Sequence, residues 1–316
     1  MVRGFPALKA MRDLVHIGAS VCDDLAPMDR LTAPLLRQVL FALLTLAVLL
    51  AAPAQAAPPL VRELRVDPLA SLAPLRVPGR PPLPRFRQAP NATASSLRVA
   101  DALADGTRTN GKILALAPGR GTYSCSGTAL NTPSRSIVLT AGHCAVEHQR
   151  AGHRIVFVPA YDHGRRPFGT FEVRAVYVMP QWRRSENPDF DLAALRVRPN
   201  RFGYLTDVVG ARGFASSKSR FSAFQIFGYP AAALRGEELR SCRAHGLGSD
   251  PFTNGFGGPP TMPASCDMAA GASGGAWLFG GQYVSGVTSY SYAGRPTRLH
   301  SPYFGPAIGA FLRHLP

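Results

Sequence analysis

Residues 138–144 read Val138-Leu139-Thr140-Ala141-Gly142-His143-Cys144, a short stretch near the middle of the 316-residue chain. The apolar residues at its start are typical of a buried strand. The small residues after them bring a histidine to the exit of that strand. The position of this stretch relative to two later segments decides how the chain is interpreted.

The second segment is Asp189-Phe190-Asp191-Leu192-Ala193-Ala194-Leu195, which places a carboxylate in front of an apolar strand. Two aspartates compete for that position. We favour Asp191, because the apolar strand starts directly after it, whereas Asp189 follows Pro188 in a predicted turn.

The third segment is Gly271-Ala272-Ser273-Gly274-Gly275, a serine flanked by glycines. Acyl transfer by a serine needs a base, a group that orients the base, and donors for the developing oxyanion. Ser273, His143 and Asp191 are the candidate nucleophile, base and orienting group. The N–H groups of Gly271 and Ser273 are the candidate oxyanion donors, because glycine permits the backbone angles that such a loop requires.

The net charge of +16 arises from 35 Lys plus Arg against 19 Asp plus Glu. Nucleic-acid binding is the first class that such a charge suggests. Only three of the basic residues are lysines, and the arginines are spread along the chain in ones and twos. Residues 111–316 contain 22 Lys plus Arg and 11 Asp plus Glu. We therefore expect no nucleic-acid partner. We expect the positive charge to affect which surfaces the protein adheres to.

Residues 39–52 form an uncharged, almost wholly apolar run, preceded by Arg30 and Arg37 and followed by Ala54-Gln55-Ala56. This order is typical of a cleavable signal peptide, so residues 1–56 are predicted to be a leader. As a helix the run spans about 21 Å, which is short of the roughly 30 Å hydrocarbon core. We expect a secreted or periplasmic protein without a permanent membrane anchor. Met28 is an alternative start of the natural chain.

Residues 57–110 are rich in proline and arginine, which predicts an extended pro-segment or linker. From residue 111 the pattern changes to many short apolar segments separated by Gly, Pro and Asn, which predicts an all-β domain over 111–316. The expected strands are 113–116, 136–140, 154–158, 171–178, 192–197, 223–227 and 282–290. The single expected helix is at the C-terminus, where Pro306 begins a turn and Ile308, Phe311 and Leu312 share one face.

Four cysteines remain after the predicted leader, namely Cys125, Cys144, Cys242 and Cys266. An even number in an exported chain favours disulfides, with three pairings open. A metal site is the alternative, because His148 and His153 follow Cys144, but no CxxC or HExxH spacing is present. We expect no metal and no cofactor. The other histidines are expected on the surface or in loops: His148, His153, His163, His245, His300 and His314.

The chain resembles the chymotrypsin-like serine peptidases, and is most similar to their secreted bacterial branch, which includes the glutamyl endopeptidases. The resemblance is carried by the segments 125–128, 140–144, 191–193 and 271–275, with His143, Asp191 and Ser273 in the family's order, 48 and then 82 residues apart. It covers about residues 111–316.

The resemblance implies two antiparallel six-stranded β-barrels, at about 111–203 and 204–316, with a short C-terminal helix and the triad between the barrels. It implies Ser273 as nucleophile, His143 as base and then acid, and Asp191 as orienting group. Cys125 would pair with Cys144 beside the histidine, and Cys242 would then pair with Cys266. The implied activity is that of a serine endopeptidase acting on polypeptides, and we expect a monomer.

Three departures from the family concern activation and specificity. Ala272 stands where trypsin-type zymogens have an aspartate that captures the new amino terminus, so that salt bridge is excluded. Asp267 lies six residues before Ser273, as the pocket acid of trypsin-like enzymes does, although the bacterial branch has an aspartate after this cysteine without basic specificity. Thr288 replaces the pocket histidine of glutamyl endopeptidases.

Residues 289–291, Ser289-Tyr290-Ser291, are predicted to be an edge that pairs with the substrate backbone. A second hypothesis belongs to a different class of function. In it, the chain is a catalytically inactive, cationic member of the same fold that binds anionic cell-surface polymers.

Overall fold

A computed structural model describes residues 64–65, 95–117, 121–150, 152–231, 235–268, 270–293 and 295–316. The predicted leader, with its apolar run at 39–52, lies outside the described residues, as does most of 57–94. Among the helices of the described part, none combines the length and apolar character that a membrane span requires.

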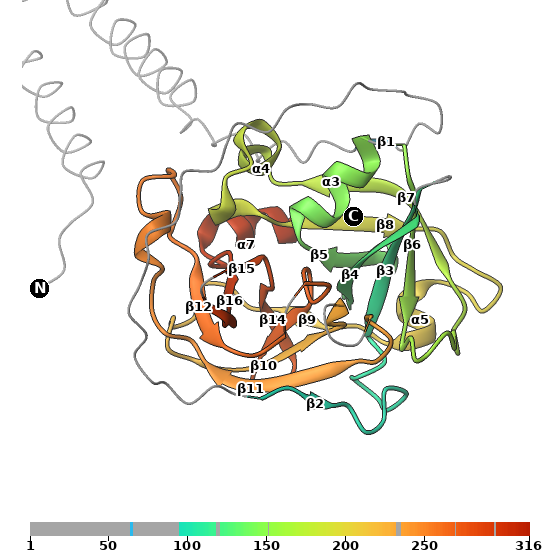
Figure 1. The fold of residues 1–316 in the computed structure, drawn as a ribbon. Coiled ribbons are helices and arrows are strands. Elements are labelled where there is room, and N and C mark those ends of the chain that lie inside the picture. Colours follow the sequence, from blue (N-terminus) through green and yellow to red (C-terminus); the bar gives the residue numbers. More distant parts are fainter. Residues whose placement is uncertain are drawn as a thin grey trace, which may run out of the picture. The chain divides into compact units, whose positions relative to one another are not determined.

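The first half is a closed barrel of six antiparallel strands (Figure 1). The strand order is β7-β6-β3-β4-β5-β8, and β8 pairs again with β7 to close the barrel. A two-residue strand, β1 (Leu64–Arg65), adds to β7 outside this circle. The six strands are β3 (Asn110–Ala117), β4 (Gly121–Leu130), β5 (Ile137–Thr140), β6 (Arg154–Pro159), β7 (Phe171–Val178) and β8 (Ala193–Val197).

The second half consists of two sheets. A six-stranded sheet has the order β2-β11-β10-β13-β14-β9, and a three-stranded sheet has the order β12-β16-β15. The strands of the larger sheet are β2 (Leu97–Arg98), β9 (Gly213–Phe214), β10 (Ala223–Gly228), β11 (Arg240–His245), β13 (Ala276–Phe279) and β14 (Tyr283–Val287). Those of the smaller sheet are β12 (Met262–Ser265), β15 (Tyr290–Tyr292) and β16 (Arg295–Ser301).

The chain crosses between these two sheets at Thr288 and Ser289. The N–H of Thr288 donates to the carbonyl of Gly275, beside the larger sheet, and the N–H of Ser289 donates to the carbonyl of His300 in the smaller one. A bridge between Gly246 and Ala264 is a second link. The all-β prediction is confirmed, but the second half differs from a single antiparallel barrel, because the ladder divides at this crossing and β9 joins β14 in parallel.

The predicted C-terminal helix is present as α7 (Pro306–Arg313), which buries Ile308, Phe311 and Leu312. Among the described residues, three further helices were not predicted: α3 (Gly142–Arg150), α4 (Pro180–Ser185) and α5 (Leu205–Val209). Two short 3₁₀ turns lie beside buried aspartates: η1 (Pro188–Phe190) contains Asp189 and is followed by Asp191, and η2 (Pro251–Thr253) is preceded by Asp250. His143 therefore lies in the first turn of a helix rather than in an open loop.

Residues 96–99 pack against the second half, although they belong to the stretch predicted as a pro-segment or linker. Strand β2 pairs with β11, and the N–H of Val99 donates to the carbonyl of Leu239. The guanidinium of Arg240 donates to the hydroxyl of Ser96 at 3.0 Å. This part of the Pro- and Arg-rich stretch is held by specific contacts, because proline is absent from residues 91–110.

Candidate active site

His143 and Asp191 are joined by two hydrogen bonds. The backbone N–H of His143 donates to Oδ1 of Asp191 at 2.9 Å, and Nδ1 of its ring lies 2.8 Å from Oδ2. Asp191 is 2% exposed and follows the 3₁₀ turn η1, in which the side chain of Asn187 accepts from the N–H of Asp189. The cap and the two bonds hold both the position and the rotation of the imidazole.

Ser289 supplies a third donor to the same carboxylate, because its hydroxyl lies 2.5 Å from Oδ2 of Asp191. Burial by itself raises the pKa of Asp191. The charge of His143 and the hydrogen bonds from His143 and Ser289 outweigh it, and the pKa lies below its ordinary value. The carboxylate is therefore ionised at neutral pH despite its burial.

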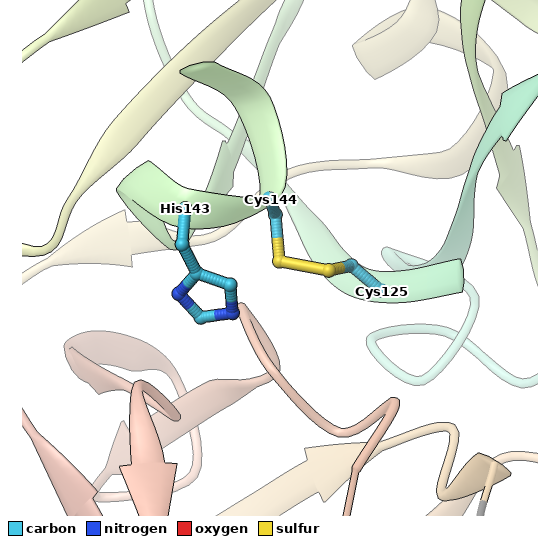
Figure 2. A group of neighbouring side chains, drawn as sticks. All are labelled: Cys125, His143 and Cys144. Carbon is cyan, nitrogen blue, oxygen red and sulfur yellow. A yellow bond between two sulfur atoms is a disulfide. The ribbon is translucent and has the colours of Figure 1, made fainter. Parts of the chain in front are cut away.

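Helix α3 begins directly after β5 and carries His143 and Cys144 side by side (Figure 2). Cys144 forms a disulfide with Cys125 of β4, which ties the start of the helix to the barrel. Gly142 faces the indole of Trp182, and a β-carbon at position 142 would lie 2.6 Å from that ring. A glycine before the histidine is thus required for the helix to approach Trp182.

The segment 270–275, here called the serine loop, has a backbone held at four successive carbonyls. The carbonyls of Ala270 and Ala272 accept from the N–H groups of Ala231 and Gly275, at 2.6 and 2.9 Å. The carbonyl of Gly271 accepts from the hydroxyl of Ser126, and that of Ser273 from its N–H, at 2.9 and 2.7 Å.

These bonds set the direction of the N–H groups in the serine loop. Because no peptide bond among the described residues is cis, each N–H points away from the carbonyl of the same peptide group. In the described part of the chain, the N–H groups of Gly271 and Ser273 donate to no acceptor. Among the described residues, these two donors of the serine loop are thus unpaired.

The serine loop lies against the strand end that leads to His143. A β-carbon at Gly274 would lie 2.1 Å from the hydroxyl oxygen of Thr140 and 3.0 Å from the nitrogen of Ala141. Gly274 also has a φ of +79°, which favours glycine. On the other side, its N–H donates to the carbonyl of Thr288 at 2.7 Å. The serine segment, the histidine segment and residues 288–289 therefore meet.

Of the residues predicted to bind substrate, Thr288 and Ser289 are buried and used internally. The hydroxyl of Thr288 accepts from the indole N–H of Trp277 at 3.0 Å. Tyr290 and Ser291 are partly buried and belong to β15. This strand lies at one end of its sheet, and within the described residues only β16 pairs with it.

Asp267 is exposed, and its Oδ1 accepts from the N–H of Ser96 at 2.8 Å. The carboxylate therefore holds the segment that leads into β2. This contact provides a structural reason for an aspartate directly after Cys266 and does not support a pocket acid. Cys266 itself is bonded to Cys242, so both expected disulfides are present.

A buried polar cluster around Tyr290 was missed by sequence reasoning. Oδ2 of Asp250 accepts from the hydroxyls of Tyr290 and Tyr292, at 2.9 and 2.6 Å. The ring of His300 stacks on that of Tyr290 at 4.7 Å between centroids. His300 is 2% exposed, which corrects its assignment to the surface. Burial lowers its pKa to about 4, so the imidazole is neutral at neutral pH.

Asp189, the rival of Asp191, is fully buried, and neither carboxylate oxygen has a hydrogen-bond partner in the described part of the molecule. Burial raises the pKa of Asp189 to about 6. The hydroxyl of Thr253 and the N–H of Gly258 offset this rise in part, although both lie outside good hydrogen-bonding geometry. Only Asp191 contacts His143, which agrees with the preference for that residue.

The described residues contain two groups of possible metal ligands. Within each group the candidate ligand atoms lie within 4.8 Å of one another. One group is Cys125, His143 and Cys144, and the other is Cys242, Cys266 and Asp267. In both groups the cysteines are oxidised to disulfides. A cysteine binds a metal as the thiolate, and without the disulfide cysteines each group keeps a single ligand, so these groups do not fit a metal site as they stand.

The matching family model is described as trypsin and covers residues 107–304. The chain belongs to the trypsin family. Protease Anisep from Arthrobacter nicotinovorans is 34% identical, with a TM-score of 0.59, over 65% of this chain and 94% of that chain. The thermostable serine protease AL20 from an extremophilic microorganism is 28% identical, with a TM-score of 0.59, over 66% of this chain and 96% of that one.

A Glu endopeptidase is 19% identical, with a TM-score of 0.57, over 70% of this chain and 95% of the other, a likeness that shows the fold alone. No curated protein matches the chain. The fold is therefore that of the trypsin-family serine proteases, with its closed barrel, second six-stranded sheet and C-terminal helix.

Proposed function

We propose that this trypsin-family chain is an exported serine endopeptidase that hydrolyses polypeptides through an acyl-enzyme. Ser273 is the nucleophile, His143 the general base and then acid, and Asp191 the group that orients His143. The observation that carries the proposal is the pair of hydrogen bonds from His143 to one buried, ionised carboxylate.

An ionised carboxylate only accepts hydrogen bonds, so Nδ1 of His143 carries the hydrogen that faces Asp191. The lone pair of the neutral ring then belongs to Nε2. In the proposed reaction, Nε2 takes the proton of Ser273 as its Oγ attacks the carbonyl carbon. The same proton passes to the leaving nitrogen when the C–N bond breaks. Water then repeats the sequence on the acyl-enzyme, releases the acid and restores Ser273.

The negative oxygen of the tetrahedral intermediate needs donors that are already in place. The N–H groups of Gly271 and Ser273 fit this role, because the carbonyls of Ala270 and Ala272, in the same peptide groups, are held on the opposite side. The loop then needs no rearrangement when charge develops.

Substrate binding is assigned to the edge of β15 that, among the described residues, pairs with no other strand. Its other edge pairs with β16, through Tyr290 with His300 and Ser291 with Leu299. An extended peptide adds to such an edge through main-chain hydrogen bonds. A substrate recognised in this way is a polypeptide.

Export is part of the proposal. Two disulfides indicate an oxidising compartment, which agrees with the apolar run at 39–52. We place the mature protein in the periplasm or outside the cell. Its net positive charge would affect adhesion to anionic surfaces.

The test is hydrolysis of casein by the exported protein, expressed from the full-length sequence, and by its Ser273→Ala variant. Ser185→Ala is the matched control, since Ser185 is exposed and its hydroxyl bonds only the carbonyl of Gln181. Wild type and the control should hydrolyse casein, and Ser273→Ala should not. A correctly folded wild type that binds an anionic polymer without hydrolysing casein would favour the inactive cationic module instead.

A further inference from the structure

We propose that Ser126 is a positioning residue, whose hydroxyl locks the serine loop in the conformation that presents the two oxyanion donors. The proposal rests on the function proposed above and assigns a role to a residue that the motif alone left without one. In this chain, the Ser126 bond takes the place of the salt bridge between a new amino terminus and an aspartate that orders the same loop in trypsin-type zymogens.

Ser126 uses all of its polar groups around the serine loop. Its hydroxyl donates to the carbonyl of Gly271 and accepts from the N–H of Tyr229, both at 2.9 Å. Its N–H donates to the carbonyl of Ser273 at 2.7 Å, and its own carbonyl accepts from the hydroxyl of Thr140 at 2.9 Å. The side chain is 1% exposed, so these bonds are made without competition from solvent.

The hydroxyl acts at the point where the loop is least constrained. The carbonyls of Ala270 and Ala272 are held by backbone N–H groups, which any side chain at those positions preserves. The carbonyl of Gly271 is held by a side chain alone. Gly271 has a φ of +94°, a region where glycine rotates at low cost. A change of ψ at Gly271 would alter the orientation of its N–H relative to that of Ser273, because this bond lies between the two donor groups.

No charged group of the loop can replace this bond. Ala272 stands at the position where the zymogen aspartate is expected, and it is fully buried. It lies against Gly228, where an added β-carbon would be 2.8 Å from the methyl group of Ala272. This contact is apolar and offers no carboxylate that could pair with an inserted amino terminus. The loop is therefore anchored from within the folded domain, by Ser126, and its order does not depend on cleavage of the segment before it.

The test compares Ser126→Ala with Thr128→Val in the full chain. Thr128 is the matched control because it lies on the same strand, is fully buried, and donates its hydroxyl to the carbonyl of Thr109, outside the serine loop. Removing a whole oxyanion donor lowers kcat by about 100- to 1000-fold, so misplacing the donors in Ser126→Ala should lower kcat by about 10- to 100-fold. KM should change by less than about twofold, since the lost interaction belongs to the transition state.

Affinity for a peptide boronate, which mimics the tetrahedral intermediate, should fall in parallel with kcat in Ser126→Ala and stay unchanged in Thr128→Val. Ser126→Thr keeps the hydroxyl and should recover most of kcat. An equal effect of Ser126→Ala and Thr128→Val on kcat and on boronate affinity would overturn the proposal, because it would show a general loss of stability.

Hydrogen–deuterium exchange separates this inference from the proposed function. In Ser126→Ala, peptides that cover 270–275 should exchange faster by about tenfold, while those from β3 keep the wild-type rate. If 270–275 exchange faster in Ser126→Ala but the wild type does not hydrolyse casein, the role of Ser126 is supported and the peptidase function is contradicted. Unchanged exchange in 270–275 overturns the role of Ser126, whether or not the wild type hydrolyses casein.

Discussion

Ser289 donates a hydrogen bond of 2.5 Å from its hydroxyl to Oδ2 of Asp191. The same oxygen lies 2.8 Å from Nδ1 of His143, so the side chain of a residue predicted to pair with the substrate backbone supports the orienting carboxylate. The bond reaches across 98 residues of sequence and links the crossing between the two sheets of the second half to the first barrel.

We expect Ser289→Ala to lower kcat by about tenfold, because a hydrogen bond to a charged group contributes about 1.5–3 kcal/mol. The pKa of Asp191 should rise in this variant, since one of the bonds that lower it is lost. Ser301→Ala is the control, as its buried hydroxyl bonds the N–H of Val287 and not a carboxylate. Steady-state kinetics would contradict the account if Ser289→Ala kept the wild-type kcat.

The two neighbouring aspartates should differ in how strongly the same substitution lowers kcat. Asp191→Asn should lower kcat by about 10⁴-fold, because an amide N–H facing Nδ1 stabilises the wrong tautomer of His143, as it does in the chymotrypsin triad. Asp189→Asn should keep kcat within about twofold, since Asp189 does not contact His143. Both variants are isosteric, so folding is checked by circular dichroism. Equal losses of kcat would mean that the wrong aspartate is assigned.

The buried carboxyl group of Asp189 should make the stability of the protein depend on pH. Its pKa is raised from 3.8 to about 6, so between these values the folded state holds a proton that the unfolded state has released. Stability should therefore fall as the pH rises through this window and then level off. The shift corresponds to a loss on the order of 2–3 kcal/mol at neutral pH. Arg220 and Asp250 are the other charged groups that act on this carboxyl.

Urea unfolding of Asp189→Asn at pH 4 and pH 7 measures this effect. The variant should be more stable than wild type at pH 7, by about 1–3 kcal/mol, and equal to it near pH 4. Asp207→Asn is the control, because Asp207 is exposed and pairs with Arg135 at the surface. A less stable Asp189→Asn at pH 7 would show that the buried carboxylate has partners that the amide lacks.

The two disulfides should separate stability from activity. Replacing either pair by serine should cost about 3 kcal/mol in the chain-entropy model, since the cysteines are 19 and 24 residues apart. Loss of Cys125–Cys144 should also lower kcat, because Cys144 follows His143 directly. Loss of Cys242–Cys266 should leave kcat closer to wild type. Urea unfolding and casein turnover measure both effects, and the reverse order of kcat values would contradict this assignment.

Much of the first barrel could be predicted from the sequence, because β5, β6, β7 and β8 are continuous apolar or alternating runs. Strands β11 and β12 could not, since arginine and histidine in β11 and proline in β12 interrupt the apolar pattern of a strand. Helix α3 was missed for a related reason. Its sequence has no helical apolar period, and the disulfide at Cys144 and the packing of Gly142 on Trp182 hold it.

The candidate site was predictable in its residue types but not in its support. His143, Asp191 and Ser273 lie in short, recognisable segments. The contact between Ser126 and Gly271 joins residues 145 apart, and no local pattern indicates it. Likewise, the burial of His300 depends on the rings of Tyr290 and Tyr292 packing around it. Such contacts are properties of the tertiary structure.

The most direct test of the central claim is the mass of the peptide labelled by a fluorophosphonate probe in the exported full chain. The account predicts a single adduct on Ser273, formed by wild type, lost in Ser273→Ala and strongly slowed in Asp191→Asn. A folded wild type that stays unlabelled, or an adduct on another serine, would contradict it.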